Sequence, residues 1–330
     1  MKSRAAVLHG LDQPWVIEEI EVDEPKANEV LVNWKVAGMC HSDEHFVTGD
    51  MVPPQELLDM MGAGDFFPFI GGHEGAGVVV KVGPGVTSVK PGDHVSASFV
   101  PSCGRCRYCS TGRQNLCNMG AGTLMGGMIT DGTHRHHVAD GRPVKLMAKL
   151  GTFSEYACVA EASLIKVEPD LPMEAVALVS CGVATGWGSA TTRADTQPGD
   201  TVVVVGIGGI GINAVQGARM AGAKRIIAID PVEFKREKAM EFGATHTFPS
   251  MAEAMQSVTE LTWGEMADRV IMTPGVLHGD MMGEAMNLVG KGGTCVVTAI
   301  SPMQETGADI SLFNLAMWNK EIKGTIFGSL

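Results

Sequence analysis

Hydrophobic and polar positions alternate along much of the first half of the chain. Residues 28–37 read Asn-Glu-Val-Leu-Val-Asn-Trp-Lys-Val-Ala, and every second position on one side is apolar, which predicts a half-buried strand. Three further short runs, bounded by turns with Gly and Pro, are predicted strands: 77–82, 94–97 and 156–159. The pattern therefore predicts a mostly β region, rich in glycine, with irregular loops.

The pattern changes near residue 186, where runs typical of buried strands begin to alternate with runs typical of helices. Residues 201–205 are a continuous β-branched run, followed by a glycine-rich turn and a helical stretch to about residue 221. Later strands are predicted at 225–230, 269–272 and 293–299, and later helices at 233–242, 252–259 and 279–289. Strands that alternate with helices of this length predict a parallel sheet covered on both faces.

The composition fits a folded chain of two domains. Its 330 residues exceed what one hydrophobic core usually supports, and 45% hydrophobic with 19% charged residues exclude a disordered chain. With 25 basic and 37 acidic residues, the net charge of −12 argues against binding to nucleic acid or to an anionic membrane. No apolar run approaches the roughly 18 residues that span a bilayer, and no secretory signal is recognisable, so we expect a cytoplasmic protein.

Four of the eight cysteines lie close together, with the spacing C-x2-C-x2-C-x7-C: Cys103, Cys106, Cys109 and Cys117. In a reducing compartment such a cluster indicates a metal more often than disulfides. Four thiolates at about 2.3 Å complete the tetrahedral shell of a zinc ion and leave no open position, so the predicted site is structural. The alternatives are an iron–sulfur centre, whose bacterial spacing differs, and four unrelated thiols.

A glycine-rich turn follows the strand at 201–205. Its glycines are Gly206, Gly208, Gly209 and Gly211. The first, second and last of these have the spacing G-x-G-x-x-G. Asp230 ends the next predicted strand, 19 positions after Gly211. This context predicts a dinucleotide site, in which the glycines let the pyrophosphate approach and the carboxylate accepts the ribose hydroxyls. A carboxylate repels a 2′-phosphate, which favours NAD over NADP. Lys235 is a candidate ribose contact or a solvated lysine, and a turn without a ligand is the alternative for the motif.

Three separate segments carry further candidate ligands. Residues 40–45 read Cys-His-Ser-Asp-Glu-His, residues 71–75 read Gly-Gly-His-Glu-Gly, and residues 180–182 read Ser-Cys-Gly. Two cysteines and one histidine can form a zinc site whose fourth position takes water or substrate. Each residue alone is more often a buried cysteine or a hydrogen-bonded histidine. Beside a hydride cofactor, however, zinc would polarise the oxygen on the carbon that exchanges hydride.

Together these motifs resemble those of the zinc-dependent alcohol dehydrogenases of the medium-chain dehydrogenase/reductase superfamily. The family's order of motifs covers nearly the whole chain: Gly-Met-Cys-His-Ser-Asp-Glu-His, Gly-Gly-His-Glu-Gly-Ala-Gly, the four cysteines, Ser-Cys-Gly-Val-Ala-Thr-Gly and Val-Gly-Ile-Gly-Gly-Ile-Gly. The resemblance implies an α/β fold with a GroES-like, mostly β catalytic domain over 1–185, which carries the structural-zinc segment. A Rossmann domain with a doubly wound parallel sheet would occupy 186–330, without the C-terminal return segment that the family has.

The resemblance also implies how a catalytic zinc is held. Its ligands would be Cys40, His73 and Cys181. Glu74 would lie close behind them and exchange as a ligand, and Asp43 would orient His73, because a ligand imidazole needs a partner for its other N–H. With the structural ion, the chain would hold two zinc ions.

For the reaction, the resemblance implies hydride transfer between an alcohol, expected to be primary, and NAD, which gives an aldehyde or a ketone. Ser42 would take the alcohol proton and pass it through the cofactor ribose to His45 and solvent. His41 would lie near the pyrophosphate and Thr185 near the nicotinamide. The expected partners are small-molecule substrates and further copies of the chain, in a homodimer or homotetramer that forms through an edge strand at 321–328.

Several alternatives stay open at this point. The segment 47–70 resembles a subgroup of actinobacterial dehydrogenases that are assayed with a nitroso dye and retain their NAD, or it is a surface insertion with a short Met-rich helix. The substrate could instead be an S-(hydroxymethyl)thiol, the adduct of a thiol with formaldehyde, or the chain could be a truncated, non-catalytic protein that binds NAD and zinc. We also expect the histidine-rich segment 134–137 to be an exposed loop that borders the substrate pocket, with metal binding as the alternative.

Overall fold

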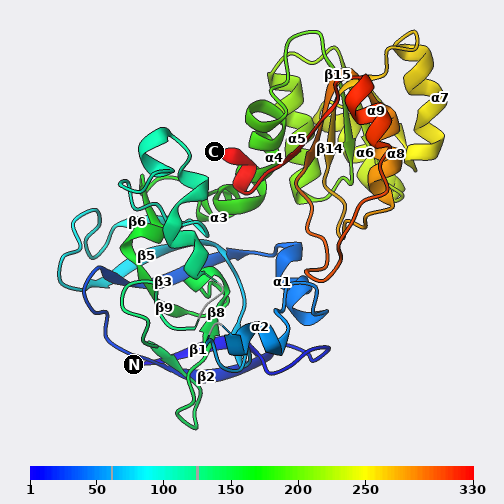
Figure 1. Cartoon of the computed structure of the whole chain (residues 1–330). Helices are drawn as coiled ribbons and strands as arrows, with labels where there is room; N and C mark the ends of the chain where they lie inside the picture. The colour runs from blue at the N-terminus through cyan, green and yellow to red at the C-terminus, as the bar shows by residue number, and fades with distance from the viewer. Residues whose placement is uncertain (61, 124–125) are drawn as a thin grey trace. The chain divides into compact units, whose positions relative to one another are not determined.

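The computed structural model describes residues 1–60, 62–123 and 126–330. The chain divides into two compact units, Met1–Cys181 and Gly182–Leu330 (Figure 1). Most elements predicted from the hydrophobic pattern are present in these units. The strand at 201–205 and the helix at 233–242 have the bounds that the sequence predicts.

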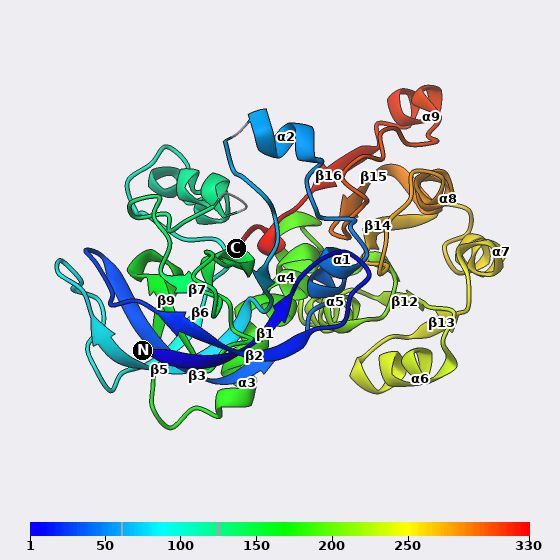
Figure 2. The ribbon, with the colours of Figure 1, turned by 90° about the horizontal axis from the view of Figure 1, so that it is seen from below.

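The described residues of the first unit form two five-stranded sheets, ordered β7-β2-β1-β4-β8 and β10-β6-β5-β3-β9. The strands are β1 (Lys2–Leu8), β2 (Val16–Val22), β3 (Glu29–Gly38), β4 (Phe69–Ile70), β5 (Glu74–Val82), β6 (His94–Ala97), β7 (His136–His137), β8 (Lys145–Leu146), β9 (Tyr156–Ala160) and β10 (Leu164–Val167). Three α-helices belong to the same described residues: α1 (His41–Val47), α2 (Gln55–Met60) and α3 (Met173–Leu178). Figure 2 shows β1 and β2 side by side, and their pairing is antiparallel.

The pattern of apolar positions did not predict β1 and β2. In β2 only Ile20 and Val22 are buried, because one face of the strand carries glutamates toward solvent. Strand β3, by contrast, has buried side chains at Val30, Val32 and Trp34, as the period-two pattern predicts. Glu29 and Leu31 on its other face are buried as well, so the first part of the strand is not half-buried as expected. A strand at the edge of the core therefore gives a weaker signal than one at its centre.

The segment 47–70 folds back on helix α1 through aromatic side chains. Phe46 of α1 has its ring centroid 5.6 Å from that of Phe66 and 4.7 Å from that of Phe69. All three side chains are buried. The packing fixes α1, which carries several of the candidate site residues, against the β structure of the first unit.

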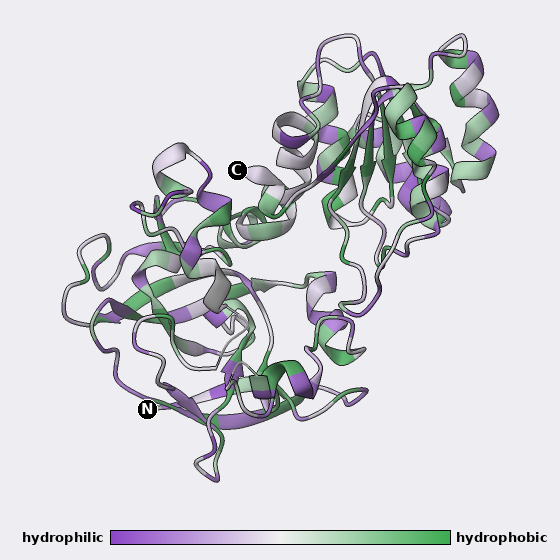
Figure 3. Ribbon diagram, viewed as in Figure 1, coloured by the Kyte–Doolittle hydropathy of each residue, from purple (hydrophilic) through white to green (hydrophobic). Residues whose placement is uncertain are grey.

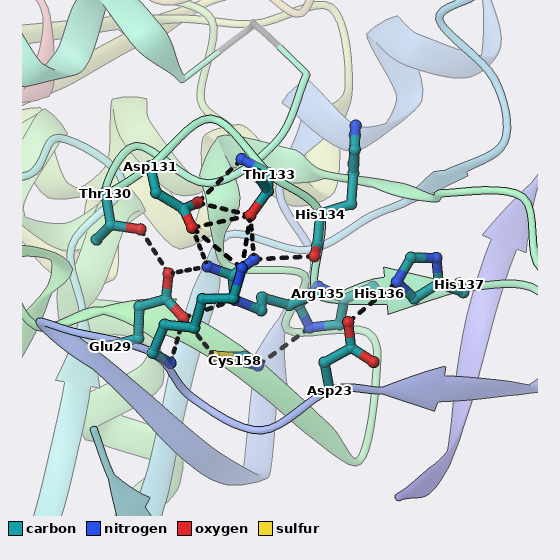
Figure 4. A network of polar contacts seen from close by, with 11 residues as sticks. Asp23, Glu29, Thr130, Asp131, Thr133, His134, Arg135, His136, His137 and Cys158 are labelled. Carbon is teal, nitrogen blue, oxygen red and sulfur yellow. Dashed lines mark hydrogen bonds and ion pairs between the residues drawn. The ribbon is translucent and has the colours of Figure 1, made fainter. Parts of the chain in front are cut away.

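The histidine-rich segment 134–137 is not the exposed loop that we expected. Arg135 is 1% exposed and His136 is 2% exposed, so the expectation is wrong for these two residues. Arg135 donates from Nε and Nη2 to the two carboxylate oxygens of Glu29, each at 2.8 Å (Figure 4). The local pattern could not reveal this burial, because the carboxylate that neutralises the guanidinium lies 106 positions away.

The second unit is built on a six-stranded parallel sheet with the order β13-β12-β11-β14-β15-β16. The strands are β11 (Thr201–Val205), β12 (Arg225–Ile229), β13 (His246–Phe248), β14 (Ala267–Met272), β15 (Val289–Val297) and β16 (Glu321–Gly324). The α-helices of the second unit are α4 (Ala184–Gly188), α5 (Gly209–Met220), α6 (Glu233–Phe242), α7 (Met251–Leu261), α8 (Met281–Leu288) and α9 (Leu312–Met317). Numbered from β11, this order is the doubly wound arrangement of dinucleotide-binding folds, as predicted.

The central strand β11 is hydrophobic on both faces because helices cover both. Val202 and Val204 belong to one apolar cluster with Ala214 of α5, whereas Val203 and Val205 belong to the cluster that includes residues of α7 and α8. Figure 3 shows this sheet as the most hydrophobic part of the unit. The turn that follows β11 is thereby held on a rigid support.

No helix in the described residues is both long enough and apolar enough to cross a membrane. The longest helix of the second unit, α5, has 12 residues.

Candidate metal and dinucleotide sites

The four clustered cysteines of the first unit converge on one point. Their sulfur atoms all lie within 4.8 Å of one another. Two pairs, Cys103 with Cys109 and Cys106 with Cys117, have Sγ–Sγ distances of 4.0 Å. Zinc–sulfur bonds of about 2.3 Å in a tetrahedron place the sulfurs about 3.8 Å apart. The arrangement therefore fits a zinc ion held by four thiolates.

Backbone N–H groups point at these sulfurs. The N–H of Cys106 donates to Sγ of Cys103 at 3.3 Å, and the N–H of Cys109 donates to Sγ of Cys106 at 3.5 Å. The N–H groups of Cys109 and Asn118 lower the pKa of Cys106 to about 6, whereas burial raises the pKa of Cys117 to about 11. Such N–H donors favour the thiolate form that a zinc ion requires.

A second group of ligand atoms lies elsewhere in the same unit. Cys40, His73, Glu74 and Cys181 each offer one atom, and these atoms lie within 4.8 Å of one another. His73, Glu74 and Cys181 are buried, and Cys40 is half-buried. Two sulfurs and an imidazole are a donor set of catalytic zinc sites, in which one position stays open to substrate. The structure thus brings together the three ligands that the sequence predicted, from segments far apart in the chain.

Two neighbouring strands place the first three of these residues. Strands β3 and β5 pair antiparallel, with Gly38 opposite Glu74, so Cys40 just after β3 lies near His73 just before β5. A Cβ atom at Gly38 would collide with the Glu74 carboxylate. Glycine is therefore needed at Gly38 to let the carboxylate lie behind the metal ligands.

Cys181 reaches the group from a wide helical turn. Residues Val179–Val183 form a π-helical turn after α3. The hydroxyl of Ser180 donates to the carbonyl of Ala177 at 2.5 Å and accepts the N–H of Gly75 at 3.2 Å. Because Gly75 lies in β5, these bonds tie the turn to the strand that follows His73.

Asp43 faces the ring of His73. The distance from Nδ1 of His73 to Oδ2 of Asp43 is 3.5 Å, and the other carboxylate oxygen accepts the N–H of Gly72 at 2.7 Å. Nδ1 of His73 is buried and has no shorter hydrogen bond to any residue that the structure describes. With Nδ1 turned to the carboxylate, Nε2 is the ring nitrogen that a metal could use.

The surroundings of Cys40 favour its thiolate form, which is the form that binds a metal. Contact with Cys181 is the largest cause that lowers the pKa of Cys40, to about 3; burial opposes it, and His73 adds to it. Burial alone would lower the pKa of His73, but Asp43 and Cys40 outweigh burial and raise that pKa to about 10. The Cys40 thiolate then lies beside a protonated His73 ring. A divalent cation that binds both groups can take the place of the ring proton.

In the second unit, the glycines after β11 have two different surroundings. A Cβ atom at Gly211 would collide with the carbonyl of Gly206, so this pair lets the strand and helix α5 pack closely. At Gly208 and Gly209, by contrast, a Cβ atom would meet no described atom within 4 Å. The open space lies at the N-terminus of a 12-residue helix, where the pyrophosphate of a dinucleotide fits.

Asp230 lies beside this turn and is 4% exposed. Its carboxylate accepts the N–H of Ile207 at 2.8 Å and the N–H of Val232 at 2.9 Å. Nζ of Lys235 lies 3.6 Å from the same carboxylate. The two predicted ribose contacts are therefore neighbours, and Asp230 is fixed by backbone groups rather than by chance packing.

Comparison with known proteins shows the family to which the chain belongs. Residues 26–169 match the family described as alcohol dehydrogenase GroES-like domain, and residues 209–330 match zinc-binding dehydrogenase. The NDMA-dependent alcohol dehydrogenase of Amycolatopsis methanolica is 52% identical over 329 residues, which cover 100% of this chain and 85% of that protein. This chain belongs to the zinc-dependent alcohol dehydrogenases. The predicted fold and the predicted NAD-dependent zinc enzyme are thereby confirmed.

Solved structures of other family members have the same architecture as this alcohol dehydrogenase. The alcohol dehydrogenase zinc-binding domain protein of Burkholderia ambifaria superposes with a TM-score of 0.88 at 30% identity, over 100% of this chain and 85% of that one. Benzyl alcohol dehydrogenase of Acinetobacter calcoaceticus has a TM-score of 0.86 at 27% identity, with the same coverage. The family fold thus extends over the whole described chain.

The predicted proton carriers of this alcohol dehydrogenase lie on helix α1. The hydroxyl of Ser42 lies 3.5 Å from Sγ of Cys40. His45, three residues later and so on the same side of the helix, is buried and lies 3.0 Å from Asp50. The ring of His41 is exposed and meets that of His45 edge-on, with centroids 5.0 Å apart.

The remaining predicted cofactor contact of the dehydrogenase, Thr185, is a buried residue of helix α4. Its carbonyl accepts a hydrogen bond from the hydroxyl of Ser189 at 2.6 Å. The sequence alone did not indicate Ser180, which accepts the N–H of Gly75, or Asp50, which contacts His45. A serine directly before the cysteine and an aspartate five positions after the histidine are too common to carry a signal by themselves.

Proposed function

We propose that this dehydrogenase oxidises primary alcohols to aldehydes at a zinc ion held by Cys40, His73 and Cys181. The observation that carries the proposal is the presence of two separate ligand groups in one unit. The group of four sulfurs is closed, whereas three protein ligands leave a position for substrate. The proposed structural ligands are Cys103, Cys106, Cys109 and Cys117.

The chain's own residues hold the metal and its surroundings in place. A zinc ion in this group supplies a Lewis acid that polarises the alcohol oxygen. Asp43 holds His73 in the tautomer that presents Nε2, and Glu74 stands within reach as an exchangeable ligand. Asp43, His73 and Glu74 are buried, which would limit the access of water to this group.

Two residues of α1 are proposed to carry the proton of the alcohol. Ser42 lies beside the ligand Cys40 and takes the proton. His45, one turn further along the helix, delivers it toward solvent. The order of the two residues follows from their positions, because Ser42 lies beside Cys40 and His45 lies next to the partly exposed Asp50.

For the cofactor, we propose NAD rather than NADP, held by the turn at 206–211, with Asp230 and Lys235 at the ribose. A carboxylate in that place repels a 2′-phosphate. His41 at the pyrophosphate and Thr185 at the nicotinamide are further proposed contacts. The name of the Amycolatopsis relative and the segment 47–70 support retention of NAD as a tightly bound group.

The proposed domain bounds are 1–185 for the catalytic domain and 186–330 for the NAD-binding domain.

The proposed assembly is a homodimer or homotetramer in the cytoplasm. Strand β16 supports it, because among described strands β16 pairs with β15 alone and leaves its other edge for a second copy.

Oxidation of alcohols by the purified protein tests the proposal. With a nitroso dye as electron acceptor and no added NAD, we expect turnover of primary alcohols and reduction of the dye. A panel that contains secondary alcohols and the adduct of formaldehyde with a thiol separates the alternative substrates. Turnover of the thiol adduct alone would contradict the alcohol assignment, and loss of activity on dialysis, restored by free NAD, would contradict retention.

A further inference from the structure

A carboxylate that no predicted role uses lies against His45. Asp50 follows helix α1, and its Oδ2 lies 3.0 Å from Nδ1 of His45. A tight turn brings it there: Gly49 has a φ of 90°, and the N–H of Met51 donates to the carbonyl of His45 at 3.1 Å. The turn folds the chain back under the end of the helix.

The carboxylate is itself fixed in place. The hydroxyl of Thr48 donates to Oδ2 of Asp50 at 2.8 Å. The side chain of His45 is 3% exposed, whereas that of Asp50 is 22% exposed. A buried imidazole is therefore linked to a partly exposed anion that is held by its neighbour on the turn.

The contact decides which nitrogen of His45 carries its proton. An ionised carboxylate only accepts hydrogen bonds, so the neutral ring must carry its proton on Nδ1 and leave Nε2 as an acceptor. The other titratable group that the ring of His45 contacts in the described chain is His41, edge-on at 5.0 Å. When His45 gains a second proton, Asp50 is the anion beside it.

We propose that Asp50 is a positioning residue for proton transfer, which keeps the proton of His45 on Nδ1, presents Nε2 to the proton released by the substrate, and stabilises the resulting imidazolium. The only bond that forms or breaks on His45 is the N–H bond at Nε2. Nε2 accepts the proton, and the ring returns to its neutral form when the proton passes to water. The inference rests on the proposed function, because it takes His45 as the proton carrier.

The test combines kinetics with nuclear magnetic resonance of protein labelled with 15N-histidine, in which the signal of His45 is identified by its loss in His45→Gln. In the unmodified protein we expect neutral His45 with its proton on Nδ1. Asp50→Asn retains the shape and removes the charge, so it should lower kcat for alcohol oxidation about tenfold, with little change in KM. Asp50→Glu should recover most of the rate.

Glu44→Gln is the matched control, since it removes an exposed carboxylate from the same helix. A His45 proton on Nε2 in the unmodified protein would overturn the proposal, even if Asp50→Asn failed to fold. Equal kcat in Asp50→Asn and Glu44→Gln would overturn it as well. Absence of alcohol oxidation in the unmodified protein would instead refute the proposed function, while the tautomer measurement would still test the contact.

Discussion

At the scale of single residues, His136, which belongs to neither proposed site, shows how burial sets a protonation state. The side chain lies in the first unit, and its Nε2 accepts the N–H of Cys158 at 3.0 Å (Figure 4). Burial is the largest cause that lowers the pKa of His136, to about 3, and the neighbouring His137 and Arg135 add to it. An acceptor nitrogen in such surroundings stays neutral over the ordinary pH range.

The low pKa of His136 predicts a loss of stability in acid. In the unfolded chain a histidine has a pKa of about 6.5, so the unfolded state binds more protons between about pH 6.5 and pH 3. The free energy of unfolding should therefore fall as the pH falls through this range, by about 2 kcal/mol at pH 5 from this residue. Urea unfolding at pH 7 and pH 5 should show a smaller acid loss in His136→Gln, whereas His137→Gln, at a more exposed site, should behave like the unmodified protein.

Two glycines of the dinucleotide turn should respond differently to alanine. Gly208→Ala adds a methyl group to open space, so it should leave the melting temperature nearly unchanged and lower the amount of NAD that the purified protein retains. Gly211→Ala pushes a methyl group against the carbonyl of Gly206 and should destabilise the unit by about 1–3 kcal/mol. Unchanged NAD content in Gly208→Ala would show that the cofactor does not occupy this space.

At the scale of elements, a buried ion pair holds the segment 130–137 to strand β3. Arg135 and Glu29 have no exposed side-chain surface, and Asp131 adds a second carboxylate at 2.7 Å from Nη2 of Arg135. Figure 4 shows these groups converging from the loop and from the strand. Removal of one partner would leave an uncompensated charge in the interior.

Glu29→Gln therefore should cost more stability than Asp131→Asn. Glu29 is buried and makes two bonds to the guanidinium of Arg135, so we expect a loss of about 3 kcal/mol in the free energy of unfolding. Asp131 is 35% exposed, and water can replace part of its contact. Denaturant unfolding of the two variants gives the comparison, and an equal loss in both would argue against a buried pair.

The elements of the second unit could be predicted from the sequence more fully than those of the first. Strand β11 is apolar on both faces and is followed by glycines, which makes the strand, the turn and the helix recognisable together. Strand β2 has buried side chains at Ile20 and Val22 only, and Arg135 is buried by a partner distant in the sequence. Local patterns do not contain such distant contacts.

At the scale of the whole molecule, the sequence could predict the proposed metal ligands and the aspartate beside His73, but not Ser180 and Asp50. The ligands lie in recognisable motifs, and the structure brings Cys40, His73 and Cys181 together. The bond from Gly75 to Ser180 and the contact between Asp50 and His45 depend on how strands, helices and turns pack. Neither residue type is unusual at its place in the sequence.

Zinc content measured together with alcohol oxidation decides whether the proposed metal group that contains Cys40 performs the chemistry. The unmodified protein should hold two zinc ions per chain, one for each ligand group. Cys40→Ser should retain only the ion of the four-cysteine group and lose alcohol oxidation, while Cys295→Ala, outside both groups, should retain both ions and the activity. Two zinc ions and a near-normal rate in Cys40→Ser would contradict the account.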